Sequence, residues 1–347
     1  MALHRFLNRC KIVPVTCLLL APMTGAAFAD DLRIAIVAPV AGSTFFDAVQ
    51  SGCDARARQR ADKITITCLY GGPGFALAAP EQPSGDAGTA ATPDAQPTDL
   101  HVKTDSRSQA QIILDFAAAR VDGIAVSPSG DPAVASAITT AVKAGIPVIT
   151  FDADAPESGR AAFVGTNARD FGRALGASLK RWKPKGGKYA IVSTDPAQPA
   201  IAERIFGVRD VLGPEWSEIT ESPAVTTGAY KDAIDRIDHL LSSYYDVDAI
   251  ISVGAWPMLD TDNWRELMAR FKERVDKADV VLVVADALPE QKDLVRQGLG
   301  HVLVGQRPTD MGARIADLLV ALKSGKKSPE VVYTGFETFT RLDLVGQ

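Results

Sequence analysis

Short apolar runs alternate with amphipathic segments along most of the chain. Eight of these runs predict strands, and most are continuous and rich in β-branched residues, at 32–38, 64–69, 123–126, 147–151, 189–193, 249–253, 280–285 and 301–304. Apolar runs without polar alternation are typical of parallel strands that are covered on both faces. We therefore expect most of these segments to be inner strands of parallel sheets.

The segments between the strands show helical periodicity. The clearest apolar stripe recurs at spacings of three and four residues and consists of Tyr230, Ala233, Ile234, Ile237, Leu240, Leu241 and Tyr244. Asp131 before Pro132 is a typical helix start, and Gly145 is a typical helix end. Strands and helices that alternate over 347 residues predict an α/β protein with two doubly wound, Rossmann-like lobes.

One segment interrupts this alternation. Residues 71–100 include five Gly, five Pro and seven Ala, with few side chains that could be buried. Such a composition predicts a flexible surface insertion over 71–104. A lid or a partner-docking arm is the functional alternative for the same segment.

The first 29 residues differ in character from the rest of the chain. A basic start precedes a largely apolar stretch over 12–26, and Ala27-Phe28-Ala29 has the A-x-A pattern of a cleavage site. This pattern predicts a signal peptide over 1–29 and export to the periplasm. A membrane anchor is the alternative, but Pro14 and Pro22 leave the apolar stretch too broken for a span of about 20 residues.

Two cysteines, Cys53 and Cys68, remain after the predicted cleavage. Export would place them in an oxidising compartment, where a disulfide can persist. Cys53 falls on the inner face of a predicted helix, and Cys68 shares one face of the next strand with Ile64 and Ile66. We expect a disulfide between them, and two buried thiols are the alternative.

Charge and motifs exclude several classes of protein. The net charge is -5, or -8 for a chain that begins at residue 30, and basic side chains are scattered among acids, so nucleic acid is not an expected partner. His101, His239 and His301 lack the spacing of metal ligands. The chain has no nucleophile elbow, P-loop or dinucleotide-binding motif. We therefore expect no enzyme activity, no cofactor and no metal.

Candidate binding residues follow the predicted strands, because parallel sheets bind ligands at the carboxyl ends of their strands. Phe45 and Phe46 come after the first strand, where they form either core or a stacking wall for a ligand. Ser127 and Asp152 follow the third and fourth strands. An acid in this place either accepts hydrogen bonds from ligand hydroxyls or caps a turn.

The second half of the chain repeats this arrangement. Trp256 and Asp286 follow two of its strands, and Trp256 precedes Pro257 at the expected beginning of a helix. Its indole would be exposed between the lobes unless a ligand or the other lobe covered it. Aromatic faces combined with carboxylates and an arginine are typical of a site that holds a sugar.

Five segments together resemble the type I periplasmic sugar-binding proteins of the ribose- and galactose-binding kind, which feed ABC importers. They are IAIVAPVAGSTFFDAVQSGC at 34–53, VDGIAVSPSGDPAVASAITTAVKAGIPVITFDADAP at 121–156, VGTNARDFGRALG at 164–176, ERIFGVRD at 203–210 and GQRPTDMG at 305–312. Their order and spacing are specific. The resemblance implies two lobes joined by three crossovers, over 31–165 with 307–334 and over 166–306 with 335–347, which enclose a sugar.

The resemblance also implies particular site residues. An aromatic wall, a polar group at a strand end, one acid in each lobe, an arginine and a crossover glutamine correspond here to Phe45 and Phe46, Ser127, Asp152 and Asp286, Arg204, and Gln306. The sequence departs from the ribose-binding pattern in three places. Ala153 stands in the place of an arginine, Asn167 lies one position before the family's asparagine, and Ala255 and Trp256 replace an Asn-Asp pair. These departures argue against ribose and favour another sugar or a polyol.

The resemblance implies a monomeric periplasmic protein that captures its ligand by hinge closure and delivers it to an ABC permease. A sensor that presents its ligand-bound state to a membrane histidine kinase or a chemoreceptor is the alternative, because it would use the same closure. Transcription factors of the lactose-repressor type share the fold. They are excluded because a signal peptide stands where their helix-turn-helix would be.

Overall fold

The computed structural model describes residues 31–40, 42–60, 64–73 and 107–345. The predicted signal peptide and nearly all of the predicted insertion lie outside the described residues. Gly71, which we expected to begin the insertion, is instead the last residue of a strand.

The first lobe is built on a six-stranded parallel sheet in the order β12-β5-β4-β3-β1-β2. Its strands are β1 (Asp31–Val37), β2 (Thr65–Gly71), β3 (Gly123–Val126), β4 (Val148–Phe151), β5 (Ala162–Gly165) and β12 (Val331–Tyr333). Helices cover both faces of this sheet. One face carries α1 (Thr44–Gln59) and α10 (Pro308–Lys323), and the other carries α2 (Gln109–Ala118) and α3 (Pro132–Lys143).

The second lobe is built on a sheet in the order β13-β11-β10-β9-β6-β7, in which β8 also pairs with β6. Its strands are β6 (Gly187–Ser193), β7 (Trp216–Glu218), β8 (Ala224–Val225), β9 (Ala249–Ser252), β10 (Val281–Ala285), β11 (Val302–Gln306) and β13 (Phe336–Thr340). One face carries α4 (Ala168–Trp182) and α5 (Pro199–Val211). The other carries α6 (Tyr230–Ser243), α7 (Thr261–Arg270) and α9 (Pro289–Arg296). The short elements are η1 (Pro156–Ser158), η2 (Trp256–Met258), α8 (Lys272–Asp276) and α11 (Arg341–Leu344).

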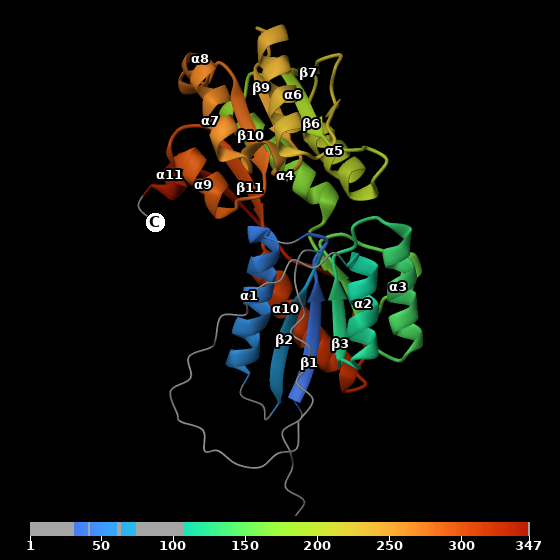
Figure 1. Cartoon of the computed structure of the whole chain (residues 1–347). Helices are drawn as coiled ribbons and strands as arrows, with labels where there is room; N and C mark the ends of the chain where they lie inside the picture. The colour runs from blue at the N-terminus through green and yellow to red at the C-terminus, as the bar shows by residue number, and fades with distance from the viewer. Residues whose placement is uncertain (1–30, 41, 61–63, 74–106, 346–347) are drawn as a thin grey trace, which may run out of the picture.

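Within the described residues the chain passes between the lobes three times. It does so between β5 and α4, between β11 and α10, and between β12 and β13. Figure 1 shows the two lobes one above the other, with the strands of the first lobe pointing towards the second. The expected fold, two doubly wound lobes joined by three crossovers, is therefore confirmed.

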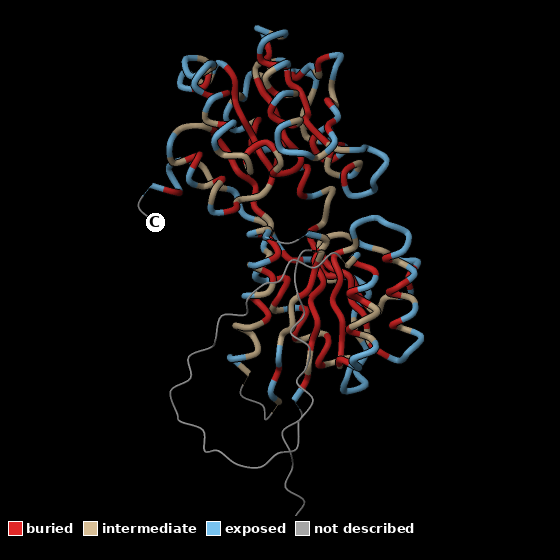
Figure 2. The backbone as a smooth tube through the Cα atoms, viewed as in Figure 1, coloured by how far each residue is buried: buried red, intermediate tan, exposed pale blue. Residues whose placement is uncertain are grey.

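The core explains why the strand sequences do not alternate. Buried residues run along the central strands of each lobe (Figure 2), and β3, β4, β9 and β10 are buried at every position. Each sheet is covered by an apolar cluster on both of its faces. A strand in that position needs apolar side chains pointing both ways.

All eight predicted strands are present, and their ends differ from the predicted ones by at most two residues. The sequence did not predict β5, β7, β8, β12 and β13. Four of these strands have only two to four residues, and no residue of β12 or β13 is buried, so these segments do not form long buried apolar runs. The strand β13 is also antiparallel to β11, although we expected parallel sheets.

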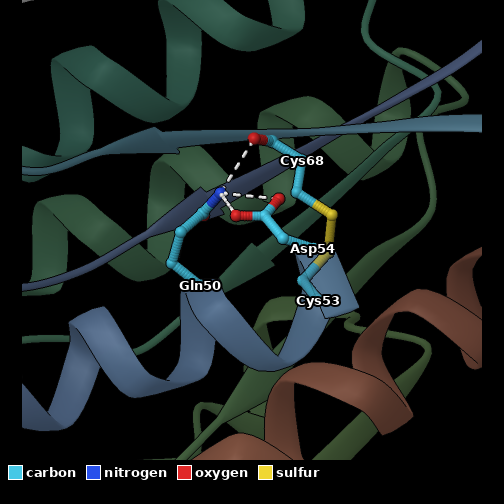
Figure 3. Close-up of a disulfide and its surroundings, with 4 residues drawn as sticks. All are labelled: Gln50, Cys53, Asp54 and Cys68. Carbon is cyan, nitrogen blue, oxygen red and sulfur yellow. Dashed lines mark hydrogen bonds between the residues drawn. A yellow bond between two sulfur atoms is a disulfide. The ribbon is translucent and has the colours of Figure 1, made fainter. Parts of the chain in front are cut away.

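Cys53 of α1 and Cys68 of β2 form a disulfide in the structure (Figure 3). Beside it, the Gln50 Nε2 group donates a hydrogen bond to the Cys68 carbonyl oxygen at 2.9 Å and contacts both carboxylate oxygens of Asp54 at 3.2 Å. The disulfide joins α1 to the edge strand β2, as predicted from the inward-facing positions of the two cysteines.

Each lobe contains one pair of helices that cross at glycines. In the first lobe a Cβ added to Gly312 of α10 would lie 1.9 Å from the Val49 carbonyl oxygen of α1. In the second lobe a Cβ added to Gly172 of α4 would lie 2.1 Å from the Arg204 carbonyl oxygen of α5. No side chain fits at either distance, so these helices can pack this closely only at glycine.

Candidate functional site

Two aspartates occupy corresponding places in the two lobes. Asp152 follows β4 of the first lobe, and Asp286 follows β10 of the second. Both have a left-handed backbone, with φ of 61° and 68°. Residues other than glycine rarely adopt this conformation, and those that do are enriched at functional sites. The ends of β4 and β10 are therefore the candidate location for ligand binding.

Asp152 is held by its neighbours in the first lobe. Its backbone N–H donates to the Val164 carbonyl oxygen at 3.0 Å, and the next N–H, of Ala153, reaches back to the Phe151 carbonyl oxygen at 2.7 Å. The Ser127 hydroxyl donates to the Asp152 carboxylate at 3.3 Å. The pKa of Asp152 is raised to about 6, mainly by burial; the positive charge of Arg204 and the Ser127 hydrogen bond oppose this rise, and the negative charge of Asp286 adds to it.

Asp286 is held in a similar way in the second lobe. Its backbone N–H donates to the Val304 carbonyl oxygen at 2.7 Å, and Gln306 Nε2 donates to its carboxylate at 2.9 Å. Burial raises the pKa of Asp286, while the positive charge of Arg204 and the Gln306 hydrogen bond lower it.

Arg204 of α5 joins these two acids electrostatically. One of its amino groups donates to the Val253 carbonyl oxygen at 2.8 Å, and its guanidinium carbon lies 4.8 Å from the centre of the Phe171 ring. Its Nε–H is buried and has no hydrogen-bond partner among the described residues. Because Arg204 acts on the pKa of both Asp152 and Asp286, the charged groups of the two lobes lie close enough to interact electrostatically.

This arrangement can bind hydroxyl groups. Each carboxylate has an oxygen beyond the one that accepts the Ser127 or Gln306 hydrogen bond, and an ionised carboxylate accepts several hydrogen bonds. Arg204 contributes an unpaired donor that is already desolvated. A hydroxyl can donate to a carboxylate and accept from a guanidinium at the same time, so neighbouring hydroxyls of one ligand would satisfy all three side chains.

Phe45 and Phe46 are both buried, at 8% and 7% exposed. Their rings meet edge to face with centres 5.2 Å apart, and Phe46 also lies 6.2 Å from Phe151, the residue before Asp152. We expected two helix neighbours to be buried together only rarely. Leu288 of the second lobe belongs to the same apolar cluster, so side chains of both lobes contribute to that cluster.

Trp256 begins the 3₁₀ helix η2, as its position before Pro257 suggested. We expected only a ligand or the other lobe to cover its indole, and this was wrong. The ring is partly buried against the core of its own lobe, and a Cβ added to Gly254 would lie 2.4 Å from it. The glycine leaves room for the indole to fold back onto the lobe.

Asn167 caps the helix α4, where its side-chain oxygen accepts the Asp170 N–H at 3.0 Å. Asp154, two residues after Asp152, is bound by Arg160 through two hydrogen bonds of 2.7 and 2.8 Å and by Thr150 at 2.5 Å. Burial opposes the effect, but the bonds from Arg160 and Thr150 hold the pKa of Asp154 below its ordinary value. Asp154 therefore supports the loop that carries Asp152.

A cavity of about 470 Å³ lies beside the acids, between α1, α9, α10 and β13. Gln306 lines it, whereas Asp152, Arg204 and Asp286 do not. Within the described ranges, no cluster of His, Cys, Asp and Glu could hold a metal ion. No helix in the same ranges combines the length and apolar character that a membrane crossing requires.

Comparisons with known proteins agree with this architecture. The ribose import binding protein RbsB of Salmonella typhimurium is 22% identical over 202 residues, which cover 58% of this chain and 66% of that protein. The chain thus spans just under two thirds of that relative's length.

Two solved structures share the fold. A solute-binding protein of an ABC transporter from Burkholderia graminis, in complex with D-arabinose, has a TM-score of 0.70 at 23% identity, over 92% of this chain and 99% of that one. GanP, a glucose-galactose binding protein from Geobacillus stearothermophilus, has a TM-score of 0.69 at 22% identity, over 91% and 99%. The family model described as "periplasmic binding protein domain" matches residues 34–327, and the chain belongs to that family.

Proposed function

We propose that this protein captures a monosaccharide or a similar polyhydroxylated ligand between its lobes for an ABC importer, without enzymatic conversion. The observation that carries the proposal is the electrostatic coupling of Arg204 to the strand-end acids Asp152 and Asp286 of the two lobes, together with the buried, unpaired Nε–H of Arg204. The ligands named for RbsB and for both solved structures are monosaccharides, which supports this class.

Ligand capture would use the three crossovers as a hinge. The lobes we propose as moving units are 31–165 with 307–334 and 166–306 with 335–347, and the passages between the sheets support these limits. Asp152 comes from one unit and Arg204 from the other. A ligand that contacts both favours the closed state by its differential affinity for that state.

The proposal includes export and a monomeric state. Family membership supports a periplasmic location, and residues 1–29 would supply the cleaved signal. Expression of the full chain in a Gram-negative host should yield a periplasmic product whose first residue is Asp30. Size-exclusion chromatography with light scattering should give the mass of one chain, and a stable dimer would contradict the monomer.

The first experiment is a thermal-shift screen of the chain from Asp30 against pentoses, hexoses, deoxysugars, disaccharides and polyols, with amino acids as controls. A ligand with micromolar Kd, present at millimolar concentration, stabilises the folded state by about 4 kcal/mol. A response to one or a few sugars supports the proposal. A response only outside the sugars would retain the fold and reject the ligand class.

Calorimetric titration of variants then tests the site. Asp152→Ala and Arg204→Ala should each weaken binding at least tenfold, because each leaves ligand hydroxyls or protein groups unpaired in a desolvated space. Arg209→Ala is the matched control, because Arg209 lies on the same helix and pairs with Glu218. Unchanged affinity in both site variants would reject the site. Import is tested by measuring sugar uptake in a strain that lacks the gene. Lost uptake would support the importer, whereas normal uptake together with a lost response to the sugar would favour the sensor.

A further inference from the structure

Two buried glutamines, one in each lobe, hold the loops that carry the candidate site. Gln109 at the beginning of α2 is 4% exposed, and Gln291 in the first turn of α9 is fully buried. They are the buried glutamines among the residues that the structure describes. In each case both ends of the carboxamide are bonded to the backbone of a loop that follows a strand.

Gln291 binds the loop of Asp286. Its Nε2 donates to the Ala285 carbonyl oxygen at 2.9 Å, and its Oε1 accepts the Leu288 N–H at 3.0 Å. The N–H of Asp286 is bonded to Val304, so both polar groups of the Ala285–Asp286 peptide are fixed. With this peptide held in place, the left-handed backbone of Asp286 has little freedom to relax.

Gln109 binds the loop of Ser127 in the first lobe. Its Nε2 donates to the Ser127 carbonyl oxygen at 2.7 Å, and its Oε1 accepts the Ser129 N–H at 3.0 Å. The Ser127 hydroxyl in turn contacts the Asp152 carboxylate. Gln109 is therefore linked to the first-lobe acid through Ser127.

Both positions require the chemistry of glutamine. A glutamate in place of Gln291, the third residue of its helix, could accept the N–H that begins the helix, but an ionised glutamate at either position has no donor for the Ala285 or Ser127 carbonyl. A methionine fills a similar volume and forms neither hydrogen bond. A helix cap alone would need only the acceptor, so the second bond, to the strand-end carbonyl, points to the loop as the part that is being held.

We propose that Gln109 and Gln291 are positioning residues that set the affinity of the inter-lobe site by fixing the loops of Ser127 and Asp286. This inference rests on the proposed sugar binding at that site. Neither glutamine needs to touch the ligand. Each glutamine fixes the loop backbone and thereby the orientation of the Ser127 or Asp286 side chain that would contact the ligand.

The test is a pair of double-mutant cycles, titrated with D-ribose, D-arabinose, D-glucose and D-galactose well below the melting temperature of each variant. Gln291→Met should weaken binding of the sugar that binds by at least fivefold, and Gln291→Glu should be no better. In the Asp286→Asn background the same Gln291→Met change should cost less than twofold, because its effect passes through Asp286. Gln109→Met should show the same loss of effect in the Ser127→Ala background.

Gln297→Met is the matched control, because Gln297 is an exposed glutamine at the other end of α9. It should bind as the unaltered protein does. A Gln291→Met variant within twofold of the unaltered protein would overturn the proposal. So would an equal loss with and without Asp286→Asn, because that result describes a general loss of structure.

A ligand-free measurement separates this inference from the proposed function. The carboxyl-carbon NMR resonance of Asp286 should move in Gln291→Met, while that of Asp152 stays in place, and Gln109→Met should show the reverse. If no sugar binds, the proposed function fails and these resonances alone decide the inference. If Gln291→Met does not fold, the Gln109 cycle decides it. Unmoved resonances in a folded variant would reject it.

Discussion

The two acids of the candidate site share a backbone conformation but are supported by different chemistry. Next to Asp152, the first lobe places an ion pair between Asp154 and Arg160, whose side chain is 5% exposed. Next to Asp286, the second lobe places the neutral carboxamide of Gln291. The same backbone conformation thus arises beside unlike supports, so the residue that supports the loop of one acid does not predict the residue that supports the other.

The supports also differ in what they connect. Arg160 donates a further hydrogen bond to the Glu330 carbonyl oxygen, next to the strand β12 that leads into the last crossover. Gln291 bonds only within its own strand-end loop. Arg160 therefore ties the loop of the first-lobe acid to the last crossover, whereas Gln291 ties the loop of the second-lobe acid to its own helix, and Asp286 itself is bonded to Gln306 at another crossover.

The largest expected loss of stability comes from substitutions at the glycines where the helices of each lobe cross. Gly312→Ala and Gly172→Ala each place a Cβ about 2 Å from a backbone carbonyl oxygen, so the helices must separate. Each change should cost on the order of 3 kcal/mol of folding free energy, as overpacking does. Only Gly172→Ala should also weaken sugar binding, because the backbone that must move belongs to Arg204. Calorimetry of unfolding and of binding checks both, and equal affinity in the two variants would contradict the distinction.

A second prediction compares the stability of the two lobes through the Cys53–Cys68 disulfide, which lies in the first lobe. Replacing Cys53 and Cys68 together by serine removes a bond that closes a loop of 15 residues. The chain-entropy model assigns such a bond about 3 kcal/mol. Thermal unfolding should show this loss of stability. Hydrogen exchange should locate it in the first lobe: amides of β1 and β3 should exchange faster, while those of β9 and β10 keep their protection. A free-thiol assay of the unreduced, unfolded protein should find none, and two free thiols would contradict the bond.

The smallest expected effect is a pH dependence that Asp152 imposes. Because its pKa is raised to about 6 from 3.8, the folded state binds more protons than the unfolded chain between these values. Without ligand, stability should therefore rise as the pH falls through 6. Binding should weaken about tenfold at one pH unit below the pKa, because only about a tenth of the carboxylate remains ionised there.

The control for this prediction is Asp152→Asn, which should reduce both trends; what remains belongs to Asp286, whose pKa is also raised by burial. His301 acts in the opposite sense on stability, since burial lowers its pKa and the folded state then resists protonation as the pH falls. Difference curves between the unaltered protein and Asp152→Asn cancel that contribution. Parallel pH curves for the two proteins would contradict the assignment.

Much of the fold could be predicted because its central strands are apolar on both faces. The strand β12 could not be predicted in this way, because its residues Val331, Val332 and Tyr333 lie at an exposed sheet edge. Asp152 and Asp286 were predictable as acids that follow buried strands. The direction of the Trp256 ring was not, because it depends on Gly254, which is only a neighbour in sequence until the fold is known.

The two buried glutamines did leave a signal in the sequence. Gln109 precedes Ile112 and Ile113 by three and four residues, and Gln291 precedes Leu294 and Val295 in the same way. A polar residue in phase with the apolar stripe of a helix points into the core. There it needs hydrogen-bond partners. The pattern places such a residue inside the protein, but only the structure shows which loop it binds.

The antiparallel strand β13 has a consequence for any attempt to shorten or divide this protein. It covers the edge of β11 along five residues, from Gln306 paired with Phe336 to Val302 paired with Thr340. A continuous fragment over 166–306 would lack that strand and would present a bare, largely apolar edge. Such edges recruit strands from other chains. In the whole chain β13 occupies this edge, so another chain cannot pair with it there. A usable single-lobe fragment would have to include β13, joined through a new linker.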